Sequence, residues 1–253
     1  MTQATFDPSS YDVAYVLFAV EGGESYDSKD DWSLLRAHVE VGDPQLRRFE
    51  VTIPGRDGVL DLSEALGGAY YGNREISARF ICLNWIEERF HLLASTIRNA
   101  IEGRVCRITF SDDLGFFWRG RPQVEATWRK NGTSEIVITA TVDPFKWNST
   151  SSYEPWLWDS FNFVTGVVTQ QSDISLSGDT ETVTLPRDPA RGKPTLWLNS
   201  GNARAKLSNQ SAWQVLKAGA NLFPEIRMSD SGEVALQLNG TGSVGVEYRV
   251  GSL

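Results

Sequence analysis

Strict alternation of apolar residues with other residues is the feature that most constrains how this sequence can fold. Near the middle of the chain, Ile136, Ile138, Ala140 and Val142 occupy every second position. This period of two is typical of a half-buried β-strand. The same reasoning predicts further strands at residues 49–53, 74–83, 105–110, 116–121 and 124–129.

Only one segment in the first half has a helical period. Between Trp85 and Glu102, apolar residues recur every three or four positions, at Ile86, Phe90, Leu93, Ile97 and Ile101. This spacing predicts one helix, with Asn84 as its N-cap and Gly103 at its end. One helix on a mainly antiparallel sheet indicates an α+β first domain.

Turn residues separate the predicted strands, with hairpins expected at 111–115 and 130–134. The sequence PGRDG at 54–58 places Pro54 and Gly55 at the centre of a type II turn, and Gly58 at a second reversal. It lacks the GK[ST] and GxGxxG patterns of phosphate-binding loops. We therefore expect a shaped connector with Arg56 exposed at its tip.

The second half contains no helical period. Residues 148–155 are polar and rich in serine, which predicts a linker between a first domain at 1–147 and a second at 156–253. Short alternating segments in the second domain predict a β-sandwich, so the chain as a whole is expected to be mainly β. The predicted strands are 163–169, 180–185, 194–199, 203–207, 213–217, 221–228, 233–239 and 243–250.

Charge and cysteine content exclude several classes of protein. The chain has 32 acidic and 24 basic residues, a formal net charge of −8, which argues against specific nucleic-acid binding through phosphates. With Cys82 and Cys106 as the only cysteines, no disulfide framework is expected, and synthesis in a reducing cytosol is the natural reading. We expect neither a signal peptide nor a membrane span.

Catalytic and metal chemistry is weakly represented. A Cys82/His91 dyad can be drawn, but Cys82 falls on the inward side of its strand, so a buried thiol is favoured, and His38 lies in another predicted strand. No histidine or cysteine pair has metal-ligand spacing, and the acidic residues between Asp27 and Asp31 favour a solvated loop over a Ca²⁺ site. We expect no enzymatic activity, no metal and no cofactor.

Tryptophans in the second half supply flat faces on which sugars could stack. The candidates for this role are Trp156, Trp158, Trp197 and Trp213. Core packing is the commoner fate of tryptophan in a sandwich, so sugar binding stands as the alternative reading.

Three short motifs carry a family resemblance that covers residues 32–147. They are PGRDG.LD at 54–61, FFWRGR at 116–121 and the Asp-Pro-aromatic-Lys-aromatic box at 143–147. In this order, with strand, helix and strand between them, they make the chain similar to the distal tail proteins of long-tailed, non-contractile bacteriophages. This family usually has Tyr where Phe117 or Trp118 and Phe145 stand here, and the aromatic character is kept.

The resemblance implies a structural virion protein at the tail tip, assembled in the cytoplasm of the bacterial host. Its first domain would be a belt that closes into a hexameric ring, and its second a galectin-like β-sandwich. Its partners would be its own copies, the tail tube protein and a tail-tip lysin or receptor-binding protein, with no membrane partner. The alternative is a carbohydrate-binding module that recognises wall sugars through the sandwich.

A ring of identical chains needs a head-to-tail contact that closes by rotation. Exposed turns and strand edges are suited to such contacts. The candidates for the subunit interface are Arg56, Asp57, Arg119 and Arg121.

Arg56→Ala is predicted to leave the fold of the single chain intact and to weaken assembly, because Arg56 is expected at an exposed tip that contacts a neighbouring copy. Size-exclusion chromatography with light scattering measures the oligomeric state of the variant. Normal assembly of the variant would remove Arg56 from the interface.

Overall fold

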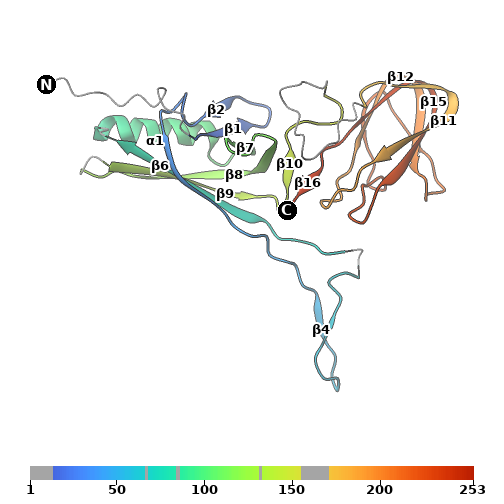
Figure 1. Ribbon diagram of the computed structural model, residues 1–253, viewed down its shortest axis with the longest axis horizontal. Coiled ribbons are helices and arrows are strands. Elements are labelled where there is room, and N and C mark those ends of the chain that lie inside the picture. The colour runs from blue at the N-terminus through green and yellow to red at the C-terminus, as the bar shows by residue number, and fades with distance from the viewer. Residues whose placement is uncertain (1–13, 66–67, 84–85, 131–132, 155–170) are drawn as a thin grey trace. The chain divides into compact units, whose positions relative to one another are not determined.

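The computed structural model describes residues 14–65, 68–83, 86–130, 133–154 and 171–253 (Figure 1). Within these residues its regular secondary structure is one helix and a set of strands, so the predicted mainly β class is confirmed. The chain forms two compact units, residues 1–146 and 147–253. The division into a belt, a linker at 148–155 and a sandwich stays a prediction.

The first unit is built on a fully antiparallel sheet of seven strands in the order β2-β1-β7-β8-β9-β6-β3. The strands are β1 (Val16–Val20), β2 (Ser25–Asp27), β3 (Leu35–Val41), β6 (Arg74–Leu83), β7 (Cys106–Phe110), β8 (Phe116–Thr127) and β9 (Thr133–Val142). Two strands that the sequence predicts separately, 116–121 and 124–129, are joined in β8. Pro122 occupies a buried position within this continuous strand.

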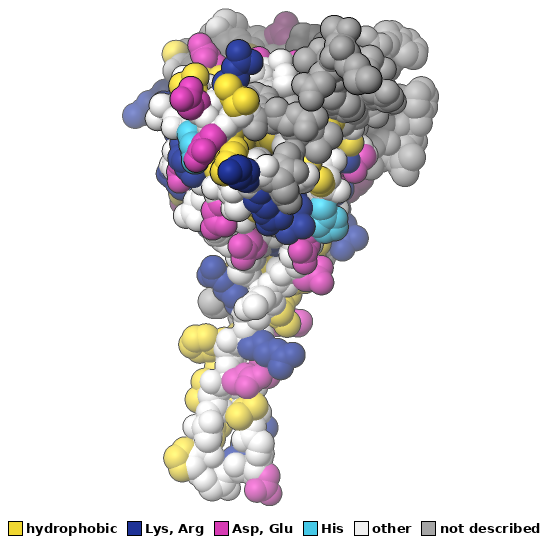
Figure 2. All heavy atoms as spheres, turned by 90° about the vertical axis from the view of Figure 1, so that its left-hand side faces the viewer, with side chains coloured by type: hydrophobic (Ala, Val, Ile, Leu, Met, Phe, Trp, Pro, Cys, Tyr) yellow, Lys and Arg dark blue, Asp and Glu magenta, His cyan; other side chains and the backbone are white. Residues whose placement is uncertain are grey.

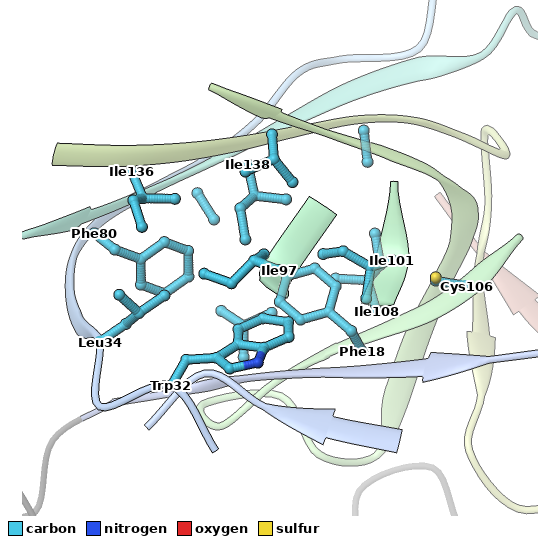
Figure 3. Close-up of a cluster of buried hydrophobic side chains, with 14 of the residues drawn as sticks. Phe18, Trp32, Leu34, Phe80, Ile97, Ile101, Cys106, Ile108, Ile136 and Ile138 are labelled. Carbon is cyan, nitrogen blue, oxygen red and sulfur yellow. The ribbon is translucent and has the colours of Figure 1, made fainter. Parts of the chain in front are cut away.

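One face of this sheet holds the core (Figure 3). The alternating residues of β9 point inward as predicted, with Ile136, Ile138, Ala140 and Val142 at most 3% exposed. Helix α1 (Glu87–Ile101) buries Phe90, Ala94, Ile97, Ala100 and Ile101 in the same unit. The other face of the sheet carries charged residues such as Arg107 and Arg119 as well as apolar ones such as Leu17 and Phe117.

Helix α1 starts later than predicted. Ile86 is at the N-cap position and makes no side-chain capping bond, while Asn84, the predicted cap, lies outside the described residues. The end agrees with the prediction, because the helix stops at Ile101 and Gly103 follows with φ +71°.

The chain between β3 and β6 leaves the sheet as a two-stranded segment, which we call the arm (described residues 42–65 and 68–73; Figure 1). Its outer part is the hairpin of β4 (Glu50–Thr52) and β5 (Val59–Asp61), which forms a separate two-stranded sheet. The arm therefore starts from two neighbouring antiparallel strands of the main sheet and projects a hairpin that belongs to no larger sheet.

The second unit is formed mainly by three long antiparallel strands, β11 (Ile174–Leu185), β15 (Val234–Glu247) and β12 (Thr195–Leu207), hydrogen-bonded in that order. Shorter strands β13 (Gln214–Val215) and β14 (Gly219–Leu222) add to β12, and β10 (Lys146–Asn148) pairs with β16 (Gly251–Ser252). Residues 148–154, predicted as a linker, are tied to this unit, since the Ser152 hydroxyl donates to the Val246 carbonyl over 2.7 Å.

Glycines let the long strands stay continuous where the sequence predicts separate ones. The predicted strands 194–199 and 203–207 merge in β12. A register shift against β15 after Leu198 changes which residues face inward, so Leu198 and Ala203 both reach the same core. Gly201 has φ +78°, and a Cβ there would overlap the carbonyl oxygen of Thr241 on β15. The strand bends here only because the position has no side chain.

Gly201→Ala is predicted to destabilise the second unit by about 2 kcal/mol or more, because the variant combines left-handed backbone strain with an overlap against β15. Gly178→Ala is the matched control: φ is +108° there, but a Cβ would meet nothing within 4 Å, so strain alone remains. Urea unfolding measures the loss of stability in each of the two variants, and hydrogen exchange in β12 and β15 shows whether the loss is located there. An equal loss of stability in the two variants would contradict the close-approach argument.

Candidate assembly surface

The arm is held together by hydrogen bonds from its base to its tip. At the base, the Gly42 N–H donates to the Glu75 carbonyl over 2.8 Å, and Leu46 pairs with Tyr71. Further out, the Leu62 N–H donates to the Phe49 carbonyl over 2.7 Å. The backbone pairing between β3 and β6 thus continues, with interruptions, into the β4–β5 hairpin.

The tip has the turn that the sequence predicts. The Arg56 N–H donates to the Ile53 carbonyl over 3.2 Å, and Gly55 has φ +81°, which is the arrangement of a type II turn. Gly58 follows with φ +75° and completes the reversal. Arg56 and Asp57 are both exposed at this tip.

The hairpin has an apolar face with no core beneath it. Val51 pairs directly with Leu60, and the alternation of the strands places Phe49, Ile53 and Leu62 on the same side. Phe49 is 67% exposed, Ile53 38% and Val51 37%. Figure 2 shows apolar side chains along the arm, outside the body of the unit. Such a surface is typical of a segment that another chain covers.

The opposite face of the hairpin carries polar residues and one exposed apolar residue, Val59. Glu50 and Asp61 are directly opposed across the strands, and Arg48 lies 3.9 Å from Glu50. The hydroxyl and N–H of Ser63 hold the pKa of Asp61 below its usual value. The hairpin is therefore amphipathic, with one side suited to water and one to a protein surface.

The solvent face of the main sheet carries a second group of charged residues. Arg107 on β7 and Arg119 on β8 are directly opposed. Glu21 accepts two hydrogen bonds from Arg119, over 2.6 and 3.0 Å, and this contact holds the pKa of Glu21 below its usual value. Arg107 lies 5.0 Å from the centroid of the Phe117 ring. Arg121 donates to the Gly103 carbonyl over 2.6 Å.

The four interface candidates therefore lie on two elements. Arg56 and Asp57 share the tip of the arm, and Arg119 and Arg121 share the exposed face of β8. Whether these residues contact another subunit stays a prediction. Of the sugar-binding candidates, Trp156 and Trp158 lie outside the described residues, and Trp197 and Trp213 are part of β12 and of the segment before β13.

Sequence reasoning missed the most distinctive part of this surface. The alternation of Phe49, Val51 and Ile53 predicts a half-buried strand. The strand is present, but all three side chains are exposed. The signal in the sequence that could have indicated this exposure is the short distance from these residues to the PGRDG turn. It leaves little chain on either side to form a sheet around the hairpin. Glu21 and Arg107 were also missed, because their pairing with β8 depends on the order of the strands.

The groups considered for catalysis are not arranged for it. Cys82 is 1% exposed, and burial raises the pKa of its thiol to about 12, so the reactive thiolate is disfavoured. His91 lies on the exposed side of α1, 3.9 Å from Glu87. Within the described residues, no cluster of three or more His, Cys, Asp or Glu is arranged to hold a metal ion. No described helix has the length and apolar character needed to cross a membrane.

Comparison with solved structures identifies the fold. The chain is similar to the crystal structure of the Dit protein (gp 19.1) of phage SPP1, described as a paradigm of the hub adsorption apparatus in phages that infect Gram-positive bacteria. The match has 14% sequence identity and a TM-score of 0.57, and covers 94% of this chain and 99% of the other. No family model and no curated protein sequence matches the chain. At this identity, the likeness shows that the two chains share a fold.

Glu21→Gln is predicted to lower the stability of the first unit at neutral pH by less than about 1 kcal/mol, because the Arg119 contact is partly exposed. The pKa of Glu21 is lowered in the folded chain, so its stabilising effect is present at neutral pH and is lost as the pH falls through that pKa. Urea unfolding at neutral and acidic pH measures this. A variant whose deficit persists in acid would show that the carboxylate charge is not the cause.

Proposed function

We propose that this protein is a structural hub of a phage tail. In this role, copies of the chain form a ring that joins the tail tube to the tail-tip or receptor-binding apparatus. The motifs at 54–61, 116–121 and 143–147 support this role, as does the fold similarity to Dit across 94% of the chain. The protein acts by binding other proteins and not by transforming a substrate.

The observation that carries the proposal is the uncovered apolar face of the arm. A two-stranded hairpin is marginally stable in water unless its apolar side packs on something. Here Phe49 is 67% exposed within its own chain, and Val51 and Ile53 are 37% and 38% exposed. Covering each of these side chains would contribute about 1 kcal/mol. A neighbouring copy that covers the whole face would supply the missing packing.

A ring follows from this arrangement if the arm and its receiving surface are different parts of the chain. A head-to-tail contact of that kind repeats from copy to copy and closes when the rotation is a whole fraction of a turn. We propose six copies, the number that the resemblance to distal tail proteins implies. The exposed face of β8, with Arg119 and Arg121, offers charged groups for further contacts between subunits or with the tube.

Net charge is compatible with a role along the path of DNA. With 32 acidic against 24 basic residues, the chain has little general attraction for phosphates. A ring through which DNA passes benefits from this, because strong binding would retain the polymer. We propose on the same basis that the protein belongs to the virion, at the end of the tail next to the tube.

Val51→Asp is predicted to weaken assembly at least about tenfold, because the variant places a charge in a contact that buries the apolar face. The matched control is Thr52→Asp, the next residue of β4, which lies on the polar face opposite Val59. Both positions are exposed in the single chain, so both variants should keep its thermal stability.

Analytical ultracentrifugation over a range of concentrations compares these variants with the unchanged protein. The proposal expects Val51→Asp to stay dissociated at concentrations where Thr52→Asp assembles. If the two variants assemble equally well, the apolar face of the arm is not a subunit contact. If no ring forms with or without purified tail tubes, the hub role itself is contradicted.

A further inference from the structure

A pair of cations lies on the outer face of the sheet of the second unit. Ala203, Ala205 and Leu207 of β12 are buried, so Arg204 and Lys206 between them point to the other side. In the residues that the structure describes, no carboxylate oxygen lies within 4.0 Å of either charged group. Among the described residues, these two neighbouring positive charges thus have no counter-charge, although the chain has a net charge of −8.

Trp213 holds these two cations together. Its ring centroid is 4.8 Å from the Arg204 guanidinium carbon and 5.0 Å from the Lys206 ammonium nitrogen. Both contacts are within the range of cation–π attraction. This attraction offsets part of the repulsion between the cations, and the indole fixes their positions before any ligand arrives.

Neutral hydrogen-bonding groups continue from the cations across the sheet. The Asn239 side-chain oxygen accepts from the Arg204 Nε over 3.0 Å, and the Asn239 amide nitrogen donates to the Gly178 carbonyl over 2.9 Å. The strand register produces two parallel rows, each made of a cation, an amide and a hydroxyl: Arg204, Asn239 and Thr180, and Lys206, Gln237 and Thr182. Neighbouring strands are about 5 Å apart, so each row is about 10 Å long, the scale of two sugar rings.

We propose that these two rows and Trp213, together the basic face, form a binding site for an acidic glycan. A ligand with a carboxylate or phosphate supplies the missing counter-charge to Arg204 and Lys206. Its hydroxyls can donate to and accept from the amides and hydroxyls of the rows. Arg204 and both threonines are exposed, so the groups are accessible to a ligand in solution.

Other ligands fit this face less well. A neutral sugar leaves both cations without a counter-charge. A nucleic acid offers phosphates, but the net charge of −8 repels a long polyanion from the rest of the chain. An acidic peptide provides carboxylates without the hydroxyls that Asn239, Gln237 and the threonines can bind.

Trp197, the other described sugar-stacking candidate, is already engaged. Its indole N–H donates to the Glu247 carboxylate over 2.8 Å, and its ring packs on Tyr153 with centroids 5.6 Å apart. Gly245, paired with Trp197, leaves the space that Tyr153 fills, since a Cβ there would overlap the Tyr153 ring.

The test uses the full chain and two acidic polymers, polygalacturonate for carboxylates and poly(glycerol phosphate) for phosphates. Neutral dextran and poly-glutamate serve as comparison polymers. The variant is Arg204→Gln/Lys206→Gln. The matched control is Lys193→Gln/Arg227→Gln, which removes two exposed cations of the same unit that lie outside the basic face.

We expect the unchanged protein to bind at least one acidic glycan more tightly than dextran or poly-glutamate, with affinity that falls as salt is added. The Arg204/Lys206 variant should bind it at least about tenfold more weakly, and the control should stay within about twofold. The polymer that is preferred identifies the acidic group as carboxylate or phosphate. Failure to bind either acidic glycan, equal binding of poly-glutamate, or equal loss in both double variants would overturn the inference. Assembly is measured separately, so this result does not depend on the hub role.

Discussion

A two-stranded hairpin cannot bury its own apolar face, and this constraint links the fold of the protein to its proposed role. The arm has a well-formed turn at Gly55 and Gly58 and a polar side around Glu50 and Asp61, so its conformation is defined by its own sequence. Its other side leaves Phe49 67% and Val51 37% exposed in the part of the chain that the structure describes. In the proposed role, a second protein surface covers this face.

The rest of the first unit gives the arm a firm base. β3 and β6, from which the arm departs, are part of a seven-stranded sheet whose inner side is packed with large apolar residues such as Phe80 and Ile136. One side of the sheet packs on the core, and the opposite side and the arm are the surfaces that the proposed contacts use. On that opposite side Glu21 pairs with Arg119 and partly neutralises its charge. Arg119 is the residue directly opposite Arg107.

Much of the fold follows from local sequence, and the candidate surfaces follow from it only in part. The alternation at Ile136 to Val142, the turn at Pro54 and Gly55, and the end of the helix at Gly103 depend on neighbouring residues, and each is present as predicted. The merging of two predicted strands into β12 was missed, because a bulge and long-range pairing decide it. The predicted start of α1 was wrong, and Ile86 is at the N-cap without a side-chain capping bond. Exposure of Phe49 and the meeting of Arg204 with Trp213 depend on tertiary structure, which periodicity does not contain.

The most direct test of the central claim is hydrogen exchange in the arm, measured by mass spectrometry at concentrations below and above those at which the chain associates. The account predicts that the amides of β4 and β5 exchange quickly in the single chain and become protected when rings form, while those of β9 stay protected throughout. Rings that form without added protection in β4 and β5 would contradict it, because the apolar face would then be uncovered in the assembly as well.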